Sequence, residues 1–193
     1  LIEMVERSDN NEKTIIMADR GYESYNVFEH IKQKGWNYLI RIKDINSSGI
    51  SSGLYLPHAE IFDEEINFLL TRRQTNEVKS NPKIYKFIAS NQIFDYLLPE
   101  DRGTYPMSFR IVRFPISEDT YEVLITNLKE DEFSIEKLKE LYHMRWGIET
   151  AFRELKYAIG LTCFHAKNPE YIKQETYAKL TMYNVCETIT MNV

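Results

Sequence analysis

The sequence predicts an α/β fold in which a strand–helix–strand unit is followed by a β-rich stretch and then by helices. Two apolar segments, 14–18 and 36–42, flank a helical pattern over 24–34. Strand, helix and strand within about 30 residues are typical of a βαβ unit in a parallel sheet. Several strand-like segments follow between 45 and 126, and helical patterns occupy most of 127–193. We therefore expect a parallel sheet core that is interrupted by β structure.

The first predicted strand covers Thr14 to Ala18 and runs into a turn at Asp19, where an Arg-Gly pair follows. The helix after it has apolar residues at helical spacing and stops at Gly35, a common C-terminal signal. The second strand, 36–42, is rich in aromatic and β-branched residues.

The stretch 45–126 is predicted to be a β-rich insertion subdomain. It opens with a Ser/Gly-rich segment, and Pro, Asn and Gly separate its strand-like segments, which are 66–72, 84–88, 109–116 and 121–126. Short connections favour antiparallel pairing of these strands. The α/β part would then consist of 1–44 and 127–193.

Two long helices are predicted near the end of the chain. Ser134 suits an N-cap, and the helix can run to about Ala158 before Gly160 ends it. Asn168 and Pro169 open the last helix, which should extend to about residue 190.

The composition favours a soluble, globular, intracellular protein. Hydrophobic residues make up 43% of the chain, which is enough for a core, and no apolar run approaches the roughly 18 residues of a membrane span. Cys163 and Cys186 lack zinc-site spacing and are expected as small buried side chains. The net charge of −5 argues mildly against nucleic acid, so local basic groups would have to hold DNA, although excess acid can also reflect carboxylates around a metal.

One face of the helix from 134 carries a pattern suited to phosphodiester chemistry. The pattern is Y-x2-R-x3-E-x6-K, at Tyr142, Arg145, Glu149 and Lys156. At about 100° per residue, the four side chains fall within about 60° of one another. A carboxylate can bind Mg²⁺, and the two cations can hold phosphate oxygens. The alternative for Arg145 and Glu149 is a surface ion pair at i, i+4.

Asp19 stands at the carboxyl end of an apolar strand, the place where open α/β sheets bind their ligands. The alternative is a turn residue or a helix N-cap. The conjunction of this carboxylate with the helix pattern favours the functional interpretation.

Four motifs, in order, carry a resemblance to a known family: Ala18-Asp19-Arg20-Gly21-Tyr22, Tyr38 to Asp44, Thr126-Asn127-Leu128, and Tyr142 through Lys156. With them the chain resembles the DDE transposases of bacterial insertion sequences of the IS-four type, whose YREK signature has the same spacing. The resemblance covers about Ile15 to Asn184. It implies a ribonuclease-H-like fold, of which 1–44 and 127–193 would be an incomplete part, interrupted by the β-rich insertion 45–126.

The resemblance also implies roles for individual residues. Asp19 would be the second catalytic Asp and Glu149 the catalytic Glu, both as ligands of two Mg²⁺ or Mn²⁺ ions. Tyr142, Arg145 and Lys156 would contact DNA phosphates. No residue before Asp19 suits the first catalytic Asp, so that carboxylate and the first core strands are expected outside this chain.

The implied activity is metal-dependent DNA cleavage and strand transfer at insertion-sequence ends, with this part inactive by itself. The implied partners are transposon-end and target DNA, together with a second copy in a synaptic homodimer, in the bacterial cytoplasm at the nucleoid. An alternative is a DNA-binding remnant of a decayed element that never cuts. A purely structural α/β domain is the third interpretation.

Further cationic side chains could either bind DNA or have a structural role. Arg41 and Lys43 alternate onto one side of the second strand near its catalytic end, which makes them candidate phosphate contacts or an ordinary solvated strand end. Arg20 could pair with a carboxylate or touch DNA. Arg72 and Arg73 could meet DNA or lie on the surface.

Three ring side chains near the signature are interpreted structurally. Trp146 is expected in the core rather than as a platform for base stacking. His143 and His165 are expected to be structural or DNA-facing, because oxygen ligands suit magnesium better than imidazole does.

Overall fold

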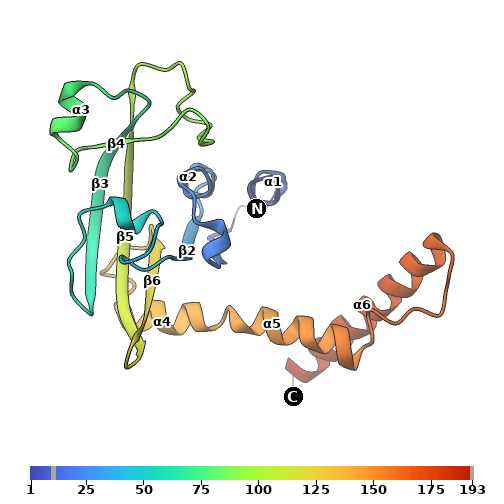
Figure 1. The fold of residues 1–193 in the computed structure, drawn as a ribbon. Coiled ribbons are helices and arrows are strands. Elements are labelled where there is room, and N and C mark those ends of the chain that lie inside the picture. The colour runs from blue at the N-terminus through green and yellow to red at the C-terminus, as the bar shows by residue number, and fades with distance from the viewer. Residues whose placement is uncertain (10–11, 192–193) are drawn as a thin grey trace. The chain divides into compact units, whose positions relative to one another are not determined.

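The computed structural model describes residues 1–9 and 12–191 and resolves two compact units, Leu1–Tyr142 and His143–Val193 (Figure 1). The first unit contains a six-stranded mixed sheet with short helices, and the second is helical. The fold is therefore mixed α/β, as the sequence predicts.

The first unit begins with helix α1 (Ile2–Arg7), followed by β1 (Ile15–Ala18), the 3₁₀ turn η1 (Arg20–Tyr22), α2 (Tyr25–Gln33) and β2 (Asn37–Ile42). It continues with the 3₁₀ turn η2 (Ser51–Gly53), β3 (Phe62–Thr71), α3 (Asn76–Ser80), β4 (Tyr85–Phe87), β5 (Thr104–Ser117) and β6 (Thr120–Thr126). Helix α4 (Ile135–His143) follows. The predicted strands and the βαβ unit are all present.

The strands form one sheet in the order β1-β2-β6-β5-β3-β4. Strands β1 and β2 are parallel, with Ala18 opposite Ile40. Strand β6 pairs antiparallel with both β2 and β5, and β3 pairs antiparallel with β5. The expectation of antiparallel pairing throughout 45–126 is wrong at one place, because β3 and β4 are parallel. The segment between them, which contains α3, is long enough for the crossover that parallel pairing requires.

The predicted boundaries at 44/45 and 126/127 fall inside this sheet. Strand β6, from the predicted insertion, is hydrogen-bonded along β2, from the predicted core. The structure instead divides the chain after Tyr142. The assignment of 45–126 as an inserted subdomain stays a prediction, but its strands extend the sheet that β1 and β2 begin.

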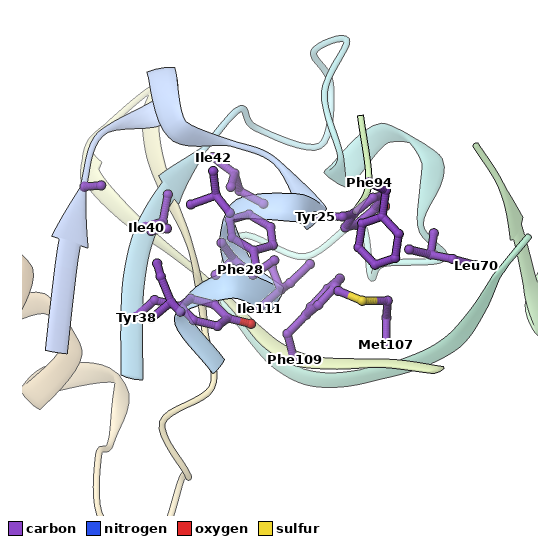
Figure 2. Close-up of a cluster of buried hydrophobic side chains, with 14 of the residues drawn as sticks. Tyr25, Phe28, Tyr38, Ile40, Ile42, Leu70, Phe94, Met107, Phe109 and Ile111 are labelled. Carbon is purple, nitrogen blue, oxygen red and sulfur yellow. The ribbon is translucent and has the colours of Figure 1, made fainter. Parts of the chain in front are cut away.

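Aromatic side chains fill the main core, between α2 and one face of the sheet (Figure 2). The ring of Phe28 on α2 stacks on Tyr38 of β2 at a centroid distance of 5.2 Å. The rings of Phe68 and Phe109 meet edge to face at 5.5 Å. Burying such side chains removes 150–250 Å² each from water, which is the main stabilising term in this unit.

The other face of the sheet packs under α4. Leu39 of β2 and Leu124 of β6 contact Leu138 and Tyr142 of α4 in a second cluster of buried side chains. Strand β2 therefore buries alternate residues on both faces, with Tyr38 in the first cluster and Leu39 in the second. A strand that is covered on both sides needs the continuous apolar composition that β2 has.

The second unit contains α5 (Trp146–Arg153), the π-helical turn η3 (Glu154–Ala158) and α6 (Pro169–Met191). Gly160, with φ +66°, ends the helical run formed by α5 and η3, as predicted. The helix expected over 134–158 is therefore not one uniform α-helix. A turn separates α4 from α5, and a π-helical turn has more residues per turn than an α-helix. The 100° periodicity that placed the four signature residues on one face does not hold along the whole run.

Two smaller expectations for the second unit are wrong. Cys163 and Cys186 are both exposed rather than buried. Trp146 is 51% exposed, although a core position was predicted. Within residues 1–9 and 12–191, no helix is long and apolar enough to cross a membrane.

Candidate active site

Asp19 lies at the carboxyl end of β1, where its exposed side chain caps the turn η1. Oδ1 of Asp19 accepts a hydrogen bond of 2.7 Å from the backbone N–H of Arg20. The capping alternative and the functional interpretation are thus compatible, because one carboxylate oxygen caps the turn while the side chain stays exposed. Fixing the rotamer in this way preorganises the carboxylate for a ligand.

Tyr142 is placed directly behind that strand end, in the core. Its side chain is 1% exposed, and its hydroxyl donates to the carbonyl oxygen of Ala18 at 3.4 Å. Other side chains cover Tyr142 in this position, and its contact with a DNA phosphate stays a prediction. The phenol instead ties α4 to the residue before Asp19, so it can position the carboxylate.

Arg145 and Glu149 form an ion pair within the second unit. Nη1 of Arg145 lies 2.8 Å from Oε1 of Glu149, and the Glu149 side chain is 50% exposed. The guanidinium also lies 5.1 Å from the centroid of the Trp146 ring. The predicted i, i+4 pair is therefore present, and half of the Glu149 side chain remains exposed.

Lys156 lies in η3, with its ammonium 5.3 Å from the centroid of the Tyr157 ring. Both side chains are exposed. A cation on an exposed aromatic ring remains accessible to an anionic ligand.

Arg41 and Lys43 have different surroundings. Nε of Arg41 lies 3.3 Å from Oε1 of Glu122 on the neighbouring strand β6, so the sheet already provides this cation with a carboxylate. Lys43 follows the end of β2 and lines a pocket of about 360 Å³ together with Arg20 and Lys86. The ammonium of Lys43 donates to the carbonyl of Ser48 at 3.0 Å, but its side chain is exposed and its partner is uncharged, so a phosphate reaches Lys43 more easily than Arg41.

The Thr126-Asn127-Leu128 motif has a structural explanation. The side-chain carbonyl of Asn127 accepts a 2.9 Å hydrogen bond from the backbone N–H of Tyr38, and its amide donates to the carbonyl of Trp36 at 3.1 Å. The hydroxyl of Thr126 donates to the carbonyl of Tyr38 and accepts from the N–H of Leu128. These contacts fasten the chain after β6 to the start of β2, which sets the path into α4.

Asp44, the last residue of the second motif, accepts a bidentate contact that the sequence did not reveal. Nε and Nη2 of Arg113 lie 2.8 and 3.0 Å from its two carboxylate oxygens. This hydrogen bonding lowers the pKa of Asp44 below its ordinary value. Arg110, buried on the same strand, pairs with Asp63 in the same way.

Of the four remaining candidates, Arg72 and His165 have structural contacts. The guanidinium of Arg72 donates to the backbone carbonyls of Leu97, Ala89 and Gln92, so it organises a loop. Arg73 and His143 are exposed. Nδ1 of His165 lies 3.1 Å from Oε1 of Glu175.

A divalent metal would find oxygen donors of the right kind at Asp19 and Glu149. Both side chains are exposed, and Mg²⁺ prefers carboxylate oxygen and water to nitrogen. Among the residues that the structure describes, no group of three or more His, Cys, Asp or Glu side chains is gathered for a metal. Asp19 and Glu149 therefore suit a divalent metal as individual ligands, but the described residues do not form a complete metal site.

Comparison with known proteins agrees with the motifs. The family model described as "Transposase DDE domain" matches residues 1–185. The InsL transposases assigned to insertion sequence elements IS186A and IS186B of Escherichia coli strain K12, and the transposase of IS421 from Escherichia coli, are each 43% identical over 58 residues. The matched segment is 30% of this chain and 16% of each relative, so the chain spans well under two thirds of their length. No solved structure gives a significant match. The chain belongs to the transposase DDE domain family.

Proposed function

We propose that this chain supplies two of the three metal-binding carboxylates of a metal-dependent DNA transposase, which cleaves insertion-sequence ends and transfers the strands. The observation that carries the proposal is Asp19, a solvent-facing carboxylate fixed at the carboxyl end of a parallel strand, in a chain of the DDE family. Ligands of open α/β sheets bind at such ends.

Asp19 and Glu149 are the proposed ligands of two Mg²⁺ or Mn²⁺ ions. A two-metal site activates a water or a 3′-hydroxyl and stabilises the leaving oxygen of an in-line displacement at phosphorus. A third carboxylate, outside this chain, would complete the set. Within the chain, the Arg20 N–H orients Asp19 and the Arg145 guanidinium orients Glu149.

Cations near these carboxylates would hold the DNA backbone. Arg145 and Lys156 carry charge beside Glu149 in sequence, and Lys43 and Arg20 lie at the carboxyl ends of β2 and β1. Charge-assisted hydrogen bonds to phosphate oxygens would compensate for the net charge of −5 of the whole chain. We assign Tyr142 a positioning role and Arg41 a weaker contact, because both side chains are engaged within the first unit.

The finer fold assignment is also a proposal. Strand β1 lies at one edge of the sheet, and a ribonuclease-H-like core would add further strands along that edge. Transposon-end and target DNA, a synaptic homodimer, a position at the bacterial nucleoid and membership of the IS-four type belong to the same proposal. The alternative, a remnant that binds DNA without cutting it, shares every residue discussed so far.

Cleavage by a complete transposase that contains this chain would test the proposal. With Mg²⁺ and a labelled insertion-sequence end, we expect Asp19→Asn and Glu149→Gln each to lower the cleavage rate about a hundredfold or more, because a catalytic metal stabilises the transition state by several kcal/mol. Glu170→Gln is the matched control, since the side chain of Glu170 is 76% exposed and forms a surface ion pair with Lys173.

Two results would count against the cleaving enzyme. Cleavage that survives Asp19→Asn would remove this carboxylate from the metal site. Tight binding of the DNA end without any cleavage by the complete, unsubstituted protein would favour the binding remnant.

A further inference from the structure

A cationic pocket lies at the carboxyl ends of β1 and β2, beside Asp19. Its cations are Arg20 from η1, Lys43 from the end of β2, and Lys86 from β4. The lining also contains Glu23 and Tyr25. The pocket has a volume of about 360 Å³, which exceeds that of a phosphate group and leaves room for a sugar. Three segments remote in sequence thus place positive charge around one cavity.

Glu23, the carboxylate among the pocket-lining residues, already accepts two backbone hydrogen bonds. Oε2 of Glu23 accepts a 3.0 Å hydrogen bond from the backbone N–H of Lys43, and Oε1 accepts from the N–H of Ile50. Glu23 therefore holds the loop after β2 in place, and part of its charge is balanced by two peptide dipoles. The three cations outnumber it, so the pocket has an excess of positive charge.

Lys86 lines this pocket and also a neighbouring one, to which Gly53 belongs. Its ammonium donates a 2.6 Å hydrogen bond to the carbonyl of Gly53, which leaves donors for a ligand. A Cβ atom added to Gly53 would lie 1.6 Å from this nitrogen. Partial burial lowers the pKa of Lys86, so an anion in the pocket would stabilise a charge that is now poorly solvated.

Tyr25, which also lines the pocket, has a buried hydroxyl without a hydrogen-bond partner among the described residues. Its side chain is 4% exposed, and its hydroxyl has no hydrogen-bond partner among residues 1–9 and 12–191. A buried hydroxyl without a partner is unfavourable. A phosphate oxygen, admitted by a small movement of the covering side chains, would accept its hydrogen bond.

We propose that Arg20, Lys43 and Lys86 form a binding subsite for one backbone phosphate of a DNA strand whose neighbouring nucleotide lies at Asp19. The proposal rests on the proposed function, which supplies the DNA strand. It adds the predicted insertion to the DNA-binding surface through Lys86, which the sequence did not single out. A Cβ atom at Gly53 would displace the ammonium of Lys86, which gives a way to test the subsite without changing any charge.

The test uses the 193-residue chain in EDTA, without divalent cations, and follows the fluorescence anisotropy of a short labelled single-stranded DNA. We expect Lys86→Gln to weaken binding about tenfold, the scale of one charge-assisted hydrogen bond, and to reduce the slope of log affinity against log salt by up to about 0.7. Lys83→Gln is the matched control, because Lys83 is exposed on the same segment and does not line the pocket.

Gly53→Ala distinguishes binding in the pocket from attraction to surface charge in general. The substitution keeps every charge and moves only the flexible end of the Lys86 side chain. We expect it to weaken DNA binding several-fold, whereas Gly103→Ala, with nothing within 4 Å of the added Cβ, should not. Circular dichroism checks that each variant is folded. Inorganic phosphate should compete with DNA for the original chain more strongly than for Lys86→Gln.

Equal losses in Lys86→Gln and Lys83→Gln, or unchanged binding in Gly53→Ala, would overturn the subsite. Because EDTA removes the metal, these outcomes do not depend on catalysis. The variants could show the expected losses of DNA binding while Asp19→Asn leaves cleavage by the complete enzyme intact. In that case the phosphate subsite stands, and only the proposed metal role of Asp19 is wrong.

Discussion

The two units differ in how they bury their apolar side chains. In Leu1–Tyr142, the aromatic and aliphatic residues of α2 and the sheet lie in two closed clusters. In His143–Val193, large apolar side chains such as Ile148, Phe152 and Tyr157 are 55 to 72% exposed. The first unit can therefore be stabilised by its own core, whereas the second relies more on polar contacts such as those of Glu175. Of the two proposed metal ligands, Asp19 belongs to the well-packed unit and Glu149 to the other.

The largest contrast should appear when one aromatic ring is truncated in each unit. Phe28 is fully buried against Tyr38, so Phe28→Ala should cost about 3–5 kcal/mol of unfolding free energy. Phe152 is 66% exposed, and Phe152→Ala should change stability by less than about 0.5 kcal/mol. Urea unfolding of both variants measures the difference. Comparable losses in the two would show that Phe152 is buried in the folded protein and that the contrast between the units is wrong.

A smaller effect is expected at the Asp44–Arg113 pair of the first unit. Asp44→Asn should cost about 2 kcal/mol, because the buried guanidinium of Arg113 loses its counter-charge. The pKa of Asp44 is lowered in the folded state, so the pair stabilises the fold above the ordinary pKa of Asp and the stabilisation is lost as pH falls through the lowered value.

Urea unfolding of the original chain and of Asp44→Asn at several pH values checks this. The gap between them should be widest near neutral pH and should narrow below about pH 4, where an unfolded-state Asp takes up its proton. A gap that does not depend on pH would contradict the role of charge in this contact.

The smallest effect should be found at Glu175 in the second unit. Hydrogen bonding from His165, reinforced by Lys179, lowers the pKa of Glu175 to about 2. The contact should therefore be intact above about pH 4.5 and be lost as pH falls toward 2. Carboxyl ¹³C chemical shifts of Glu175 measure the pKa directly, and His165→Ala should raise it. An ordinary pKa in the original chain would show that the contact is absent in solution.

Local patterns predicted much of the fold because they depend on neighbouring residues. Apolar residues at helical spacing predicted α2, and an apolar run predicted β2. Asp19 was predicted as a site residue because it directly follows a strand. The buried Arg110 and Arg113 could not be foreseen, because their carboxylate partners lie 47 and 69 residues away in sequence. Charged residues inside a strand read as solvent-facing until such a partner is known.

The sequence predicted which residues belong to the candidate site better than it predicted how they are arranged. The signature spacing found Arg145 and Glu149, which do pair, and it treated Tyr142 as part of the same surface. Periodicity assumes one uniform helix, so it could not show the turn after α4, the π-helical turn at Lys156 or the burial of Tyr142. Lys86 was missed because its relevance depends on β4 joining the sheet, a long-range pairing that no local pattern reveals.

The central claim is that Asp19 and Glu149 bind the same pair of metal ions. Fe²⁺ can replace Mg²⁺ at oxygen-rich sites, and with ascorbate and peroxide it cuts the peptide backbone close to where it is bound. In the complete transposase, we predict cuts next to both residues, competed by Mg²⁺, with Asp19→Asn and Glu149→Gln each removing both. If Asp19→Asn removes only the cut beside residue 19 and leaves the one beside Glu149 intact, the two carboxylates bind separate ions and the claim is wrong.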